Sequence, residues 1–405
     1  MFPRCNLACT PCYHAKEAQR VRSDGDHTVT QVEAQMRFLR GTRGTGQHVQ
    51  LIGGEVSLLD ADDHARALQV MLRHGRKPMS MTHGDFDESY LRRLALDAEG
   101  RPRFGVLRMA GHFDSLMLGR RGVPRPRAER DLDAPRRQFV EMFERLRAEH
   151  GVRFDLAHNM TVTPANLAEV AEVTRTVMGL GYGMASFQPA AHVGNPKRWR
   201  EDYRGLGIDE VWAQIEAGAG TRLPWVHLQM GDARCNRSAY GVIAGGRWFA
   251  LLDDRDPRDL RARDRFLAAF GGMDFERSRF ARALALLRVA ARQPALVPQA
   301  AGWALRLARR VGVGRLLTGR PRALTFVVHA FMDASVVQPA WEAMERGEVA
   351  VDLAVRAAQE RLQACSYAMA HPEQGRTVPA CVQHSILDPA ENLDLRELLP
   401  MHPNP

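Results

Sequence analysis

The chain has 405 residues, of which 45% are hydrophobic and 25% charged, and its formal net charge at pH 7 is +9. This length and apolar content suffice for a large core, so global disorder is excluded. No apolar run reaches the roughly 18 residues of a spanning helix, and no secretory pattern opens the chain, which predicts a cytoplasmic protein. Six cysteines are too few for a disulfide scaffold, so clustered cysteines are better interpreted as metal ligands or catalytic groups.

Three of the cysteines lie close together near the N-terminus. Cys5, Cys9 and Cys12 form a C-x3-C-x2-C run within the segment RCNLACTPCYH. The spacing lets one loop wrap a compact inorganic core, and iron–sulfur clusters are usually held by cysteine thiolates. Three ligands on a four-iron cluster would leave one iron open to another molecule. The alternatives are three ordinary buried thiols, or a zinc site completed by His14.

This run, with its RCNL start, resembles the signature of the radical SAM superfamily. The resemblance implies a [4Fe–4S] cluster on Cys5, Cys9 and Cys12, whose open iron binds the amino and carboxylate groups of S-adenosylmethionine (AdoMet). An electron from a donor such as ferredoxin or flavodoxin then yields methionine and a 5′-deoxyadenosyl radical, which abstracts a substrate hydrogen. The chain departs from the family at Pro11, where an aromatic residue is common, and has Tyr13 just after the third cysteine. Only residues 1–4 precede the motif, so the family's first strand is either unusually short or begins before residue 1.

A second cofactor element follows residues 47–52, which predict a short strand. Gly53, Gly54 and Glu55 come directly after this strand. The two glycines let the backbone approach a ligand closely, and the carboxylate suits a ligand ammonium. By resemblance this is the superfamily's GGE element, which holds the amino group of the AdoMet methionine. The proline that usually follows is replaced by Val56.

Strands and helices alternate through the first half of the chain, which is typical of a parallel sheet. The predicted helices span residues 30–40, 60–73, 135–150 and 163–179. The first is expected to open with a capping box of Thr30 and Glu33, and the second with Asp60 as its N-cap. The predicted strands span residues 47–52, 78–82, 104–109, 154–162 and 183–188. With a strand at the cysteine motif, six strand–helix repeats match the partial (β/α)6 barrel that the resemblance implies.

The carboxyl ends of these strands are expected to line the site, as in closed barrels. His112, Asp114 and Met160 therefore lie near AdoMet by position, and Tyr13 by its place beside the cluster. For His112, Asp114 and Met160, a role as a satisfied loop or core residue is an equal alternative. No G-x-G-x-x-G or G-x4-G-K-[ST] motif is present, so dinucleotide and Walker-type phosphate sites are not indicated.

The other three cysteines lie in the second half. Cys235 precedes a hairpin predicted over residues 240–252 and turned at Gly245-Gly246, while Cys365 and Cys381 flank a turn at residues 372–375. We interpret the three as ligands of an auxiliary [4Fe–4S] cluster. Its fourth position would be open or filled by one of three residues: His371, His384 or Asp388. Free buried thiols and a structural zinc using His384 are the alternatives.

A second, patchy resemblance covers roughly residues 225–245 and 324–390. The segment TFVVHAFMD (residues 325–333) and the paired cysteines resemble the C-terminal region of one radical SAM branch. That branch contains the archaeal tetraether-lipid synthase and related radical SAM methyltransferases. The likeness favours a lipid or another apolar small molecule as the substrate.

The positive charge is concentrated in residues 276–322, which hold eleven arginines and one acidic residue. This leaves the other 358 residues with a net charge of about −1. Apolar residues interleave with the arginines at helical spacing, and Pro294 and Pro298 separate two helices. A basic helix with an apolar face and a tryptophan predicts peripheral membrane contact, and two helices packed on the core are the alternative. Few aromatic residues lie among these arginines to stack on bases, which argues against a nucleic-acid partner.

Together these features predict an α/β protein built around a partial (β/α)6 radical SAM barrel, with an α+β C-terminal extension. The expected parts are the barrel over 1–204, a connecting helix and hairpin region over 205–275, the basic amphipathic insert over 276–322, and the auxiliary-cluster region over 323–405. The predicted reaction abstracts hydrogen from an unactivated carbon and forms a C–C bond or adds a methyl group. The alternatives are a peptide-modifying radical SAM enzyme and a non-catalytic iron–sulfur or zinc protein.

Overall fold

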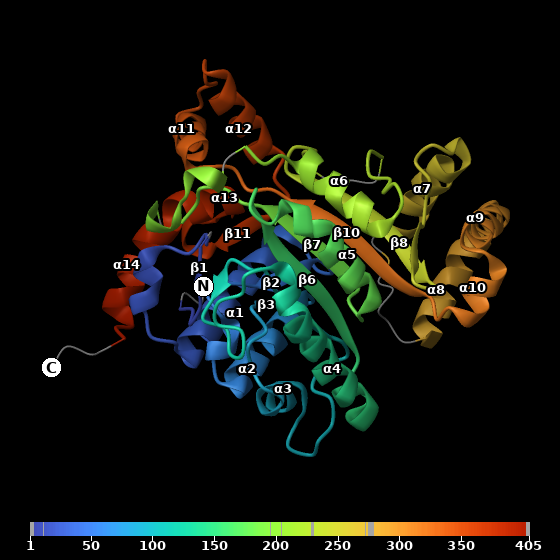
Figure 1. The fold of residues 1–405 in the computed structure, drawn as a ribbon, viewed down its shortest axis with the longest axis horizontal. Coiled ribbons are helices and arrows are strands. Elements are labelled where there is room, and N and C mark those ends of the chain that lie inside the picture. Colours follow the sequence, from blue (N-terminus) through green and yellow to red (C-terminus); the bar gives the residue numbers. More distant parts are fainter. Residues whose placement is uncertain are drawn as a thin grey trace.

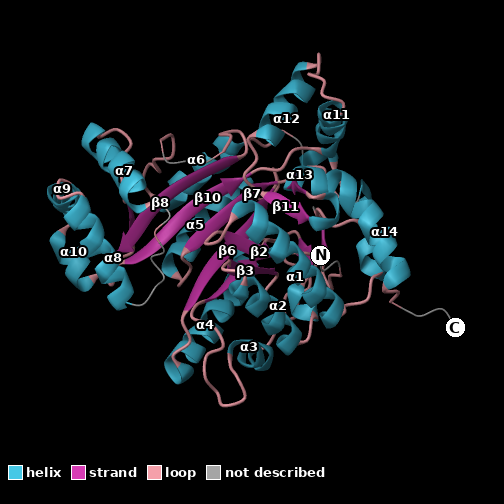
Figure 2. Cartoon of the chain, turned by 180° about the vertical axis from the view of Figure 1, so that it is seen from behind, coloured by secondary structure: helices cyan, strands magenta, loops and turns pink. Residues whose placement is uncertain are grey.

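The computed structural model describes residues 4–10, 12–194, 196–203, 205–227, 231–271, 273 and 279–401. Its central feature is an eight-stranded sheet with the order β2-β3-β4-β6-β7-β10-β8-β9. Six neighbouring strands are parallel: β2 (His48–Leu51), β3 (Lys77–Thr82), β4 (Leu107–His112), β6 (Phe154–Val162), β7 (Met184–Pro189) and β10 (Arg322–His329). The hairpin of β8 (Asn236–Ala244) and β9 (Arg247–Ala250) joins antiparallel at one edge. The sheet is curled, which confirms the predicted α/β fold with a partial-barrel sheet (Figure 2).

Helices cover one face of this sheet (Figure 1). They are α1 (Gly25–Arg43), α2 (Ala61–Arg73), α3 (Glu88–Ala95), α4 (Asp133–His150), α5 (Val170–Gly179) and α6 (Ile208–Ala219). Alternation along each strand separates this face from the other. In β3, Ser80 is buried against His64 of α2, whereas Met79 and Met81 line a cavity on the opposite face. The main core therefore lies between the sheet and the helices, and the site lies on the other side.

Several predicted element boundaries are corrected by side-chain capping. Helix α1 begins at Gly25, because the Asp24 carboxylate accepts a 2.8 Å hydrogen bond from the His27 backbone, so Thr30 and Glu33 lie inside the helix and do not cap it. Asp60 is the N-cap of α2, as predicted. β4 begins three residues later than the predicted 104–109, and α5 begins only at Val170, after a turn.

The sixth parallel strand comes from an unexpected part of the chain. The residues at the cysteine motif form β1 (Ala8–Cys9), which pairs with β5 (Met117–Leu118) in a separate two-stranded sheet. The position beside β7 is taken by β10, where Phe326 lies opposite Ala185. The barrel sheet thus includes a strand that lies far beyond the expected barrel boundary at residue 204. This strand, β10, falls almost wholly within the region expected to hold the auxiliary cluster, residues 323–405. A local apolar pattern predicts that β10 is a strand but does not specify its neighbour.

The C-terminal part forms a second, smaller core. It contains α11 (Ala334–Glu345), α12 (Leu353–Gln363), the hairpin of β11 (Ala368–His371) and β12 (Arg376–Pro379), α13 (Ala380–Val382), a π-helical turn (Gln383–Leu387) and α14 (Asp388–Leu398). After α14 the chain hydrogen-bonds to the N-terminal segment, with the Arg22 backbone N–H donating to the Leu399 carbonyl at 2.8 Å. Residues 399–401 therefore lie beside residues 20–22, which follow the cysteine loop in sequence.

The basic segment forms α8 (Arg279–Arg292), α9 (Leu296–Val311) and α10 (Val313–Thr318), and residues 276–278 of the predicted insert lie outside the described residues. With α7 (Pro257–Phe270) they make a lobe beyond the β8–β9 edge (Figure 1). None of the described helices has both the length and the apolarity needed to cross a membrane.

Candidate active site

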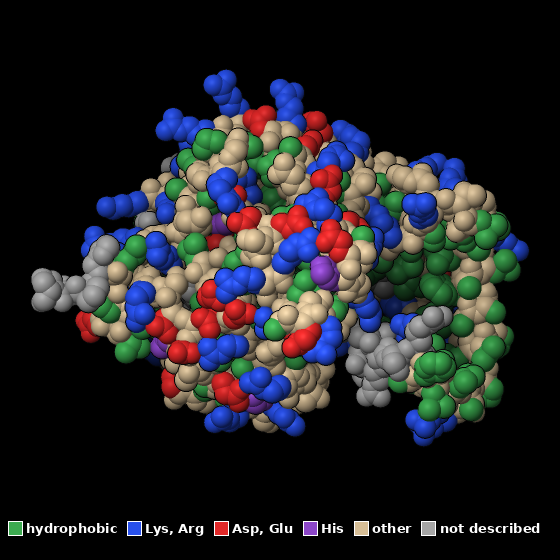
Figure 3. Space-filling view, turned by 90° about the horizontal axis from the view of Figure 1, so that it is seen from below, with side chains coloured by type: hydrophobic (Ala, Val, Ile, Leu, Met, Phe, Trp, Pro, Cys, Tyr) green, Lys and Arg blue, Asp and Glu red, His purple; other side chains and the backbone are tan. Residues whose placement is uncertain are grey.

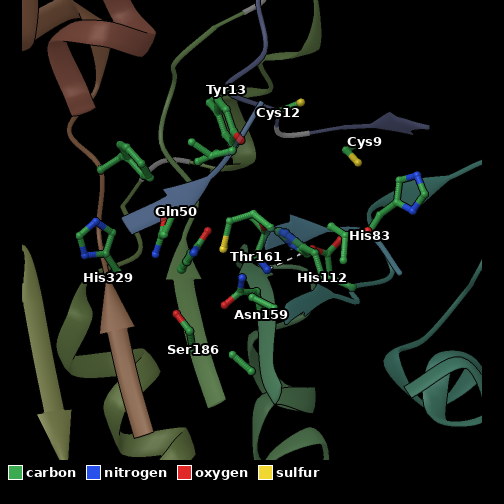
Figure 4. A pocket seen from close by; sticks show the side chains of 18 of the residues that line it. Cys9, Cys12, Tyr13, Gln50, His83, His112, Asn159, Thr161, Ser186 and His329 are labelled. Carbon is green, nitrogen blue, oxygen red and sulfur yellow. Dashed lines mark hydrogen bonds and ion pairs between the residues drawn. The ribbon is translucent and has the colours of Figure 1, made fainter. Parts of the chain in front are cut away.

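A cavity of about 380 Å³ opens at the carboxyl ends of the parallel strands, on the side of the sheet away from the helices (Figure 4). Ligand sites of open parallel sheets are usually found at this edge. The cavity walls come from β2, β3, β4, β6, β7 and β10, from the cysteine loop, and from the segment before β11. Strands far apart in sequence therefore contribute to one site.

Cys5, Cys9 and Cys12 line one end of this cavity. Burial raises the pKa of the Cys5 thiol to about 12, and it also raises the pKa values of Cys9 and Cys12. The Cys9 pKa is raised further by the nearby Cys12 and Cys5, so the three thiols interact electrostatically. Arg198 is a nearby cation that lowers all three values. In the described ranges, no three His, Cys, Asp or Glu side chains lie close enough to hold a single metal ion.

The chemistry of this donor set fits an iron–sulfur cluster. Buried thiols that raise one another's pKa values need added positive charge to ionise, and metal ions supply it. The neighbouring His14 also has its pKa lowered by burial, to about 4, and its Nε2 is buried without a hydrogen-bond partner in the described part of the chain. A neutral imidazole nitrogen thus adjoins the thiols at the cavity wall.

Gly53 and Gly54 also line the cavity and hold the cysteine loop closely. A Cβ on Gly54 would lie 2.1 Å from the Arg4 carbonyl oxygen and 2.6 Å from His14 Nε2, so no larger residue fits without movement. The Tyr13 hydroxyl donates a 3.0 Å hydrogen bond to the Gly53 carbonyl. The structure therefore brings the two sequence motifs together, with Tyr13 as a link between them.

Glu55 does not face the cavity, contrary to the expectation that its carboxylate meets a ligand ammonium. Its Oε1 accepts hydrogen bonds from the Ser57 backbone at 2.9 Å and from the Thr82 hydroxyl at 2.6 Å. Its Oε2 accepts one from the His83 backbone at 2.7 Å. The side chain is buried, and only its two glycine neighbours are among the cavity-lining residues. Glu55 thus fixes the end of β3 behind the site.

His112 and Asp114 form a hydrogen-bonded pair on the cavity wall. His112 Nε2 lies 2.6 Å from Asp114 Oδ2, which also accepts the Thr161 backbone N–H at 3.0 Å. Burial alone would raise the pKa of Asp114, but His112 and the backbone donors outweigh it and hold the pKa below its usual value. The cavity therefore has one firmly anionic group near the cysteines.

Met160 is not at the site. It is fully buried in the main core, whereas its neighbours on β6, Asn159 and Thr161, line the cavity. Successive residues of a strand point to opposite faces, so the position-based expectation was one residue out of register. The same alternation identifies inward residues that no sequence motif marks, such as Ser186 on β7 and His329 on β10.

The far end of the cavity is lined by uncharged polar groups. Gln50, Asn159, Ser186 and His329 come from different strands and surround the same space (Figure 4), and Tyr367 also lines the cavity. The Tyr367 hydroxyl donates a 2.6 Å hydrogen bond to Gln50 Oε1. Burial lowers the pKa of His329 to about 4, so this imidazole is neutral at pH 7. This end of the cavity suits an uncharged molecule.

The second set of cysteines lies beside this far end. The β11–β12 hairpin joins Cys365 and Cys381 as predicted, and the Cys235 carbonyl accepts the Ala330 backbone N–H at 2.8 Å, just after β10. Burial raises the pKa of Cys381 to about 12 and also raises that of Cys365, and Cys235 raises both further. The three thiols are therefore near one another. Arg361 Nε donates to Cys235 Sγ at 2.9 Å.

The three expected fourth ligands have other contacts. His371 Nε2 is 2.5 Å from Gln383 Oε1, and His384 Nδ1 is 2.7 Å from Asp388 Oδ2. The His384 ring packs against Tyr13, with the ring centroids 4.3 Å apart. His384 thus faces the first cysteine set, and none of these contacts joins the three residues to the second set.

Comparisons with known proteins add little to this site. No family model matches the chain, and no curated protein matches it. Among solved structures, one similar chain is described as hexahistidine-tagged anSMEcpe with bound AdoMet, with 16% identity and a TM-score of 0.29. The match covers 47% of this chain and 48% of that one, so it spans about half of each. The chain's own residues are therefore the evidence for its function.

Proposed function

We propose that this chain is a radical AdoMet enzyme that abstracts a hydrogen atom from an uncharged substrate. The observation that supports it best is a single cavity with Cys5, Cys9, Cys12 and the Gly53-Gly54 backbone at one end. The C-x3-C-x2-C spacing suits three ligands of a [4Fe–4S] cluster, and Gly53 and Gly54 line the same cavity beside the cysteine loop. When bound, the cluster supplies the electron that cleaves AdoMet to methionine and a 5′-deoxyadenosyl radical.

The chain's own residues would orient AdoMet and exclude water. AdoMet carries positive ammonium and sulfonium groups, and Asp114 offers a buried negative charge on the same wall as Cys9. His112 keeps this carboxylate ionised and in place through their 2.6 Å contact. Met79, Met81 and other apolar side chains would shield the radical from solvent.

The second cysteine set supports an auxiliary cluster on Cys235, Cys365 and Cys381. Asn236, Ser366 and Tyr367 adjoin these cysteines in sequence and line the cavity. The substrate would therefore lie between the two sets, where an auxiliary cluster could accept or return an electron.

The lining favours a substrate that is uncharged and partly apolar. Methionine side chains provide adaptable apolar contacts, and neutral amide and hydroxyl groups such as Gln50 and Ser186 provide hydrogen bonds. These properties suit a lipid or another apolar metabolite with a few polar groups. The product would be a new C–C bond or a methylated carbon.

The proposal can be tested on the full chain reconstituted anaerobically with iron and sulfide. We expect a reduced cluster whose electron paramagnetic resonance spectrum changes when AdoMet is added, and we expect Cys12→Ala to lose this change. A cluster whose spectrum does not change when AdoMet is added would support a non-catalytic iron–sulfur protein instead. Zinc retention in place of iron would support a structural metal site.

A further inference from the structure

Helix α8 turns its apolar side toward solvent. Phe280, Leu284 and Leu287 follow the i, i+4, i+7 spacing of one helix face, and all are exposed, with Phe280 at 89% and Leu287 at 66%. In a surface helix of a globular protein, such an apolar stripe normally faces the core. The outward stripe of α8 therefore has no partner among the described residues that would bury it.

Helix α9 is held to the rest of the lobe by ion pairs and hydrogen bonds. Arg306 Nε donates to Asp259 Oδ1 at 2.7 Å, and Arg310 Nη1 donates to Asp259 Oδ2 at 2.5 Å. Trp303 Nε1 donates to the Leu251 carbonyl at 2.9 Å. Trp303 thus packs inward, contrary to its expected place in a membrane-facing pattern. These contacts leave Leu305, on another side of the helix, exposed.

Exposed apolar side chains gather on this lobe. Nine of the seventeen large hydrophobic residues exposed in the described part of the chain lie between Pro257 and Thr318, including Leu267, Val297 and Leu317. Figure 3 shows hydrophobic side chains, in green, gathered on the right side of the molecule, where this lobe lies. Contiguous apolar patches of this kind usually mark an interaction surface. We call the described helices α7 to α10, over residues 257–270 and 279–318, the apolar lobe.

The charges around the apolar lobe limit what can cover it. Residues 279–322 contain ten arginines and no acidic residue. Arg288 and Arg292 are exposed on α8, and Arg309 is exposed on α9. A second copy docked through the same face would bring two such arginine sets together, and their repulsion opposes self-association. An anionic lipid surface instead offers acyl chains for the apolar stripe and phosphates for the arginines.

We propose that the apolar lobe docks on anionic lipid membranes, with α8 lying in the interface plane. Phe280, Leu284 and Leu287 would enter the acyl boundary, and Arg288 and Arg292 would contact lipid phosphates. The lobe does not open into the cavity. It precedes Arg322 at the start of β10, whereas His329 at the end of β10 lines the cavity, roughly 23 Å away along the strand. The lobe therefore anchors the protein, and this inference does not depend on the proposed chemistry.

The test is sedimentation of the full chain with vesicles at low salt. We expect binding to vesicles of equal phosphatidylglycerol and phosphatidylcholine, and little binding to pure phosphatidylcholine. Phe280→Ser with Leu287→Ser should weaken binding at least about tenfold, because two exposed apolar side chains are lost. Arg288→Glu with Arg292→Glu should weaken it similarly and reduce its salt dependence.

The matched control is Val351→Ser with Leu353→Ser, which replaces two equally exposed apolar residues outside the lobe. This control should bind like the wild type. Circular dichroism should show unchanged folding in all variants, since every substituted residue is exposed. Equal binding to neutral vesicles, or no binding at all, would overturn the proposal. So would a dimer in sedimentation velocity that the Phe280→Ser, Leu287→Ser variant abolishes, because the lobe would then bind a second copy.

Discussion

The Glu55 carboxylate accepts a 2.6 Å hydrogen bond from the Thr82 hydroxyl, behind the wall of the cavity. We expect Glu55→Gln to lower the free energy of unfolding by about 1–3 kcal/mol, because an amide NH2 would face a backbone donor in place of an acceptor. Thr82→Val should also destabilise the protein. Urea denaturation measures both, with Glu141→Gln as the control, because Glu141 is an exposed residue of α4. Loss of AdoMet affinity without loss of stability in Glu55→Gln would show that the carboxylate meets the ligand.

Gly54 gives a sharper steric test of the site. Gly54→Ala places a Cβ against the Arg4 carbonyl oxygen and His14, so we expect it to displace the cysteine loop and to reduce the iron bound on reconstitution. Gly41→Ala is the matched control, because a Cβ at that helical position meets no atom within 4 Å. It should leave iron binding unchanged and stabilise the helix by about 0.5–1 kcal/mol. Equal iron content in both variants would contradict the close approach at Gly54.

His64 should make stability depend on pH. It is fully buried, with Nδ1 2.9 Å from the Tyr90 hydroxyl and Nε2 2.7 Å from Ser80 Oγ. Burial lowers its pKa to about 4, despite a smaller opposite effect of Glu55. Because the unfolded chain binds the proton first, the stabilising contribution is complete above about pH 6.5 and is lost as pH falls toward 4. The loss amounts to roughly 3 kcal/mol at most.

Urea denaturation at pH 7.5 and pH 5 checks this dependence. We expect His64→Gln to be less stable than the wild type at pH 7.5 but to lose less stability on acidification. Comparing the two proteins cancels the contributions of other buried histidines. An identical pH dependence in both would mean that His64 is not the titrating group.

The anionic wall of the cavity should favour the charged sulfonium. Asp114→Asn keeps the shape but removes the charge, and the residue also holds the Leu116 and Thr161 backbone N–H groups. We therefore expect the affinity ratio of AdoMet to S-adenosylhomocysteine to fall about tenfold, as measured by equilibrium dialysis of the reconstituted protein. A structural effect alone would weaken both ligands equally. An unchanged affinity ratio would show that the sulfonium of AdoMet does not bind near Asp114.

The second cysteine set has its own test. We expect the wild type to hold about eight iron atoms per chain after reconstitution, and both Cys235→Ala and Cys365→Ala to hold about four. AdoMet should still change the spectrum of the remaining cluster in these variants. Equal iron contents in wild type and variants would show that Cys235, Cys365 and Cys381 are free thiols.

The sequence predicts the local elements of this fold better than their assembly. The β11–β12 hairpin follows from its turn, and the strand at 154–162 and the Asp60 cap follow from residue pattern. The place of β10 beside β7 could not be predicted, because the apolar pattern of a strand does not specify which strand pairs with it. The separation of β1 from the main sheet is missed for the same reason.

The site shows the same division. Spacing was enough to single out Cys5, Cys9 and Cys12, which the structure places at one end of the cavity. The orientation of the Glu55 side chain could not be predicted. Its carboxylate accepts hydrogen bonds from Ser57, Thr82 and His83, and these donors come together only in the folded chain. The uncharged residues that line the cavity could be predicted only in part. Alternate residues near the end of a predicted strand share one face, but the pattern does not say which face lines the cavity.

The measurement that tests the central claim most directly is formation of 5′-deoxyadenosine. The full chain is reconstituted anaerobically, reduced with dithionite and incubated with AdoMet, and the products are measured by mass spectrometry. We expect wild type and Cys365→Ala to form 5′-deoxyadenosine and methionine, and Cys12→Ala to form neither. Absence of 5′-deoxyadenosine from a wild-type protein that carries its full iron and sulfide would contradict radical AdoMet chemistry at this site.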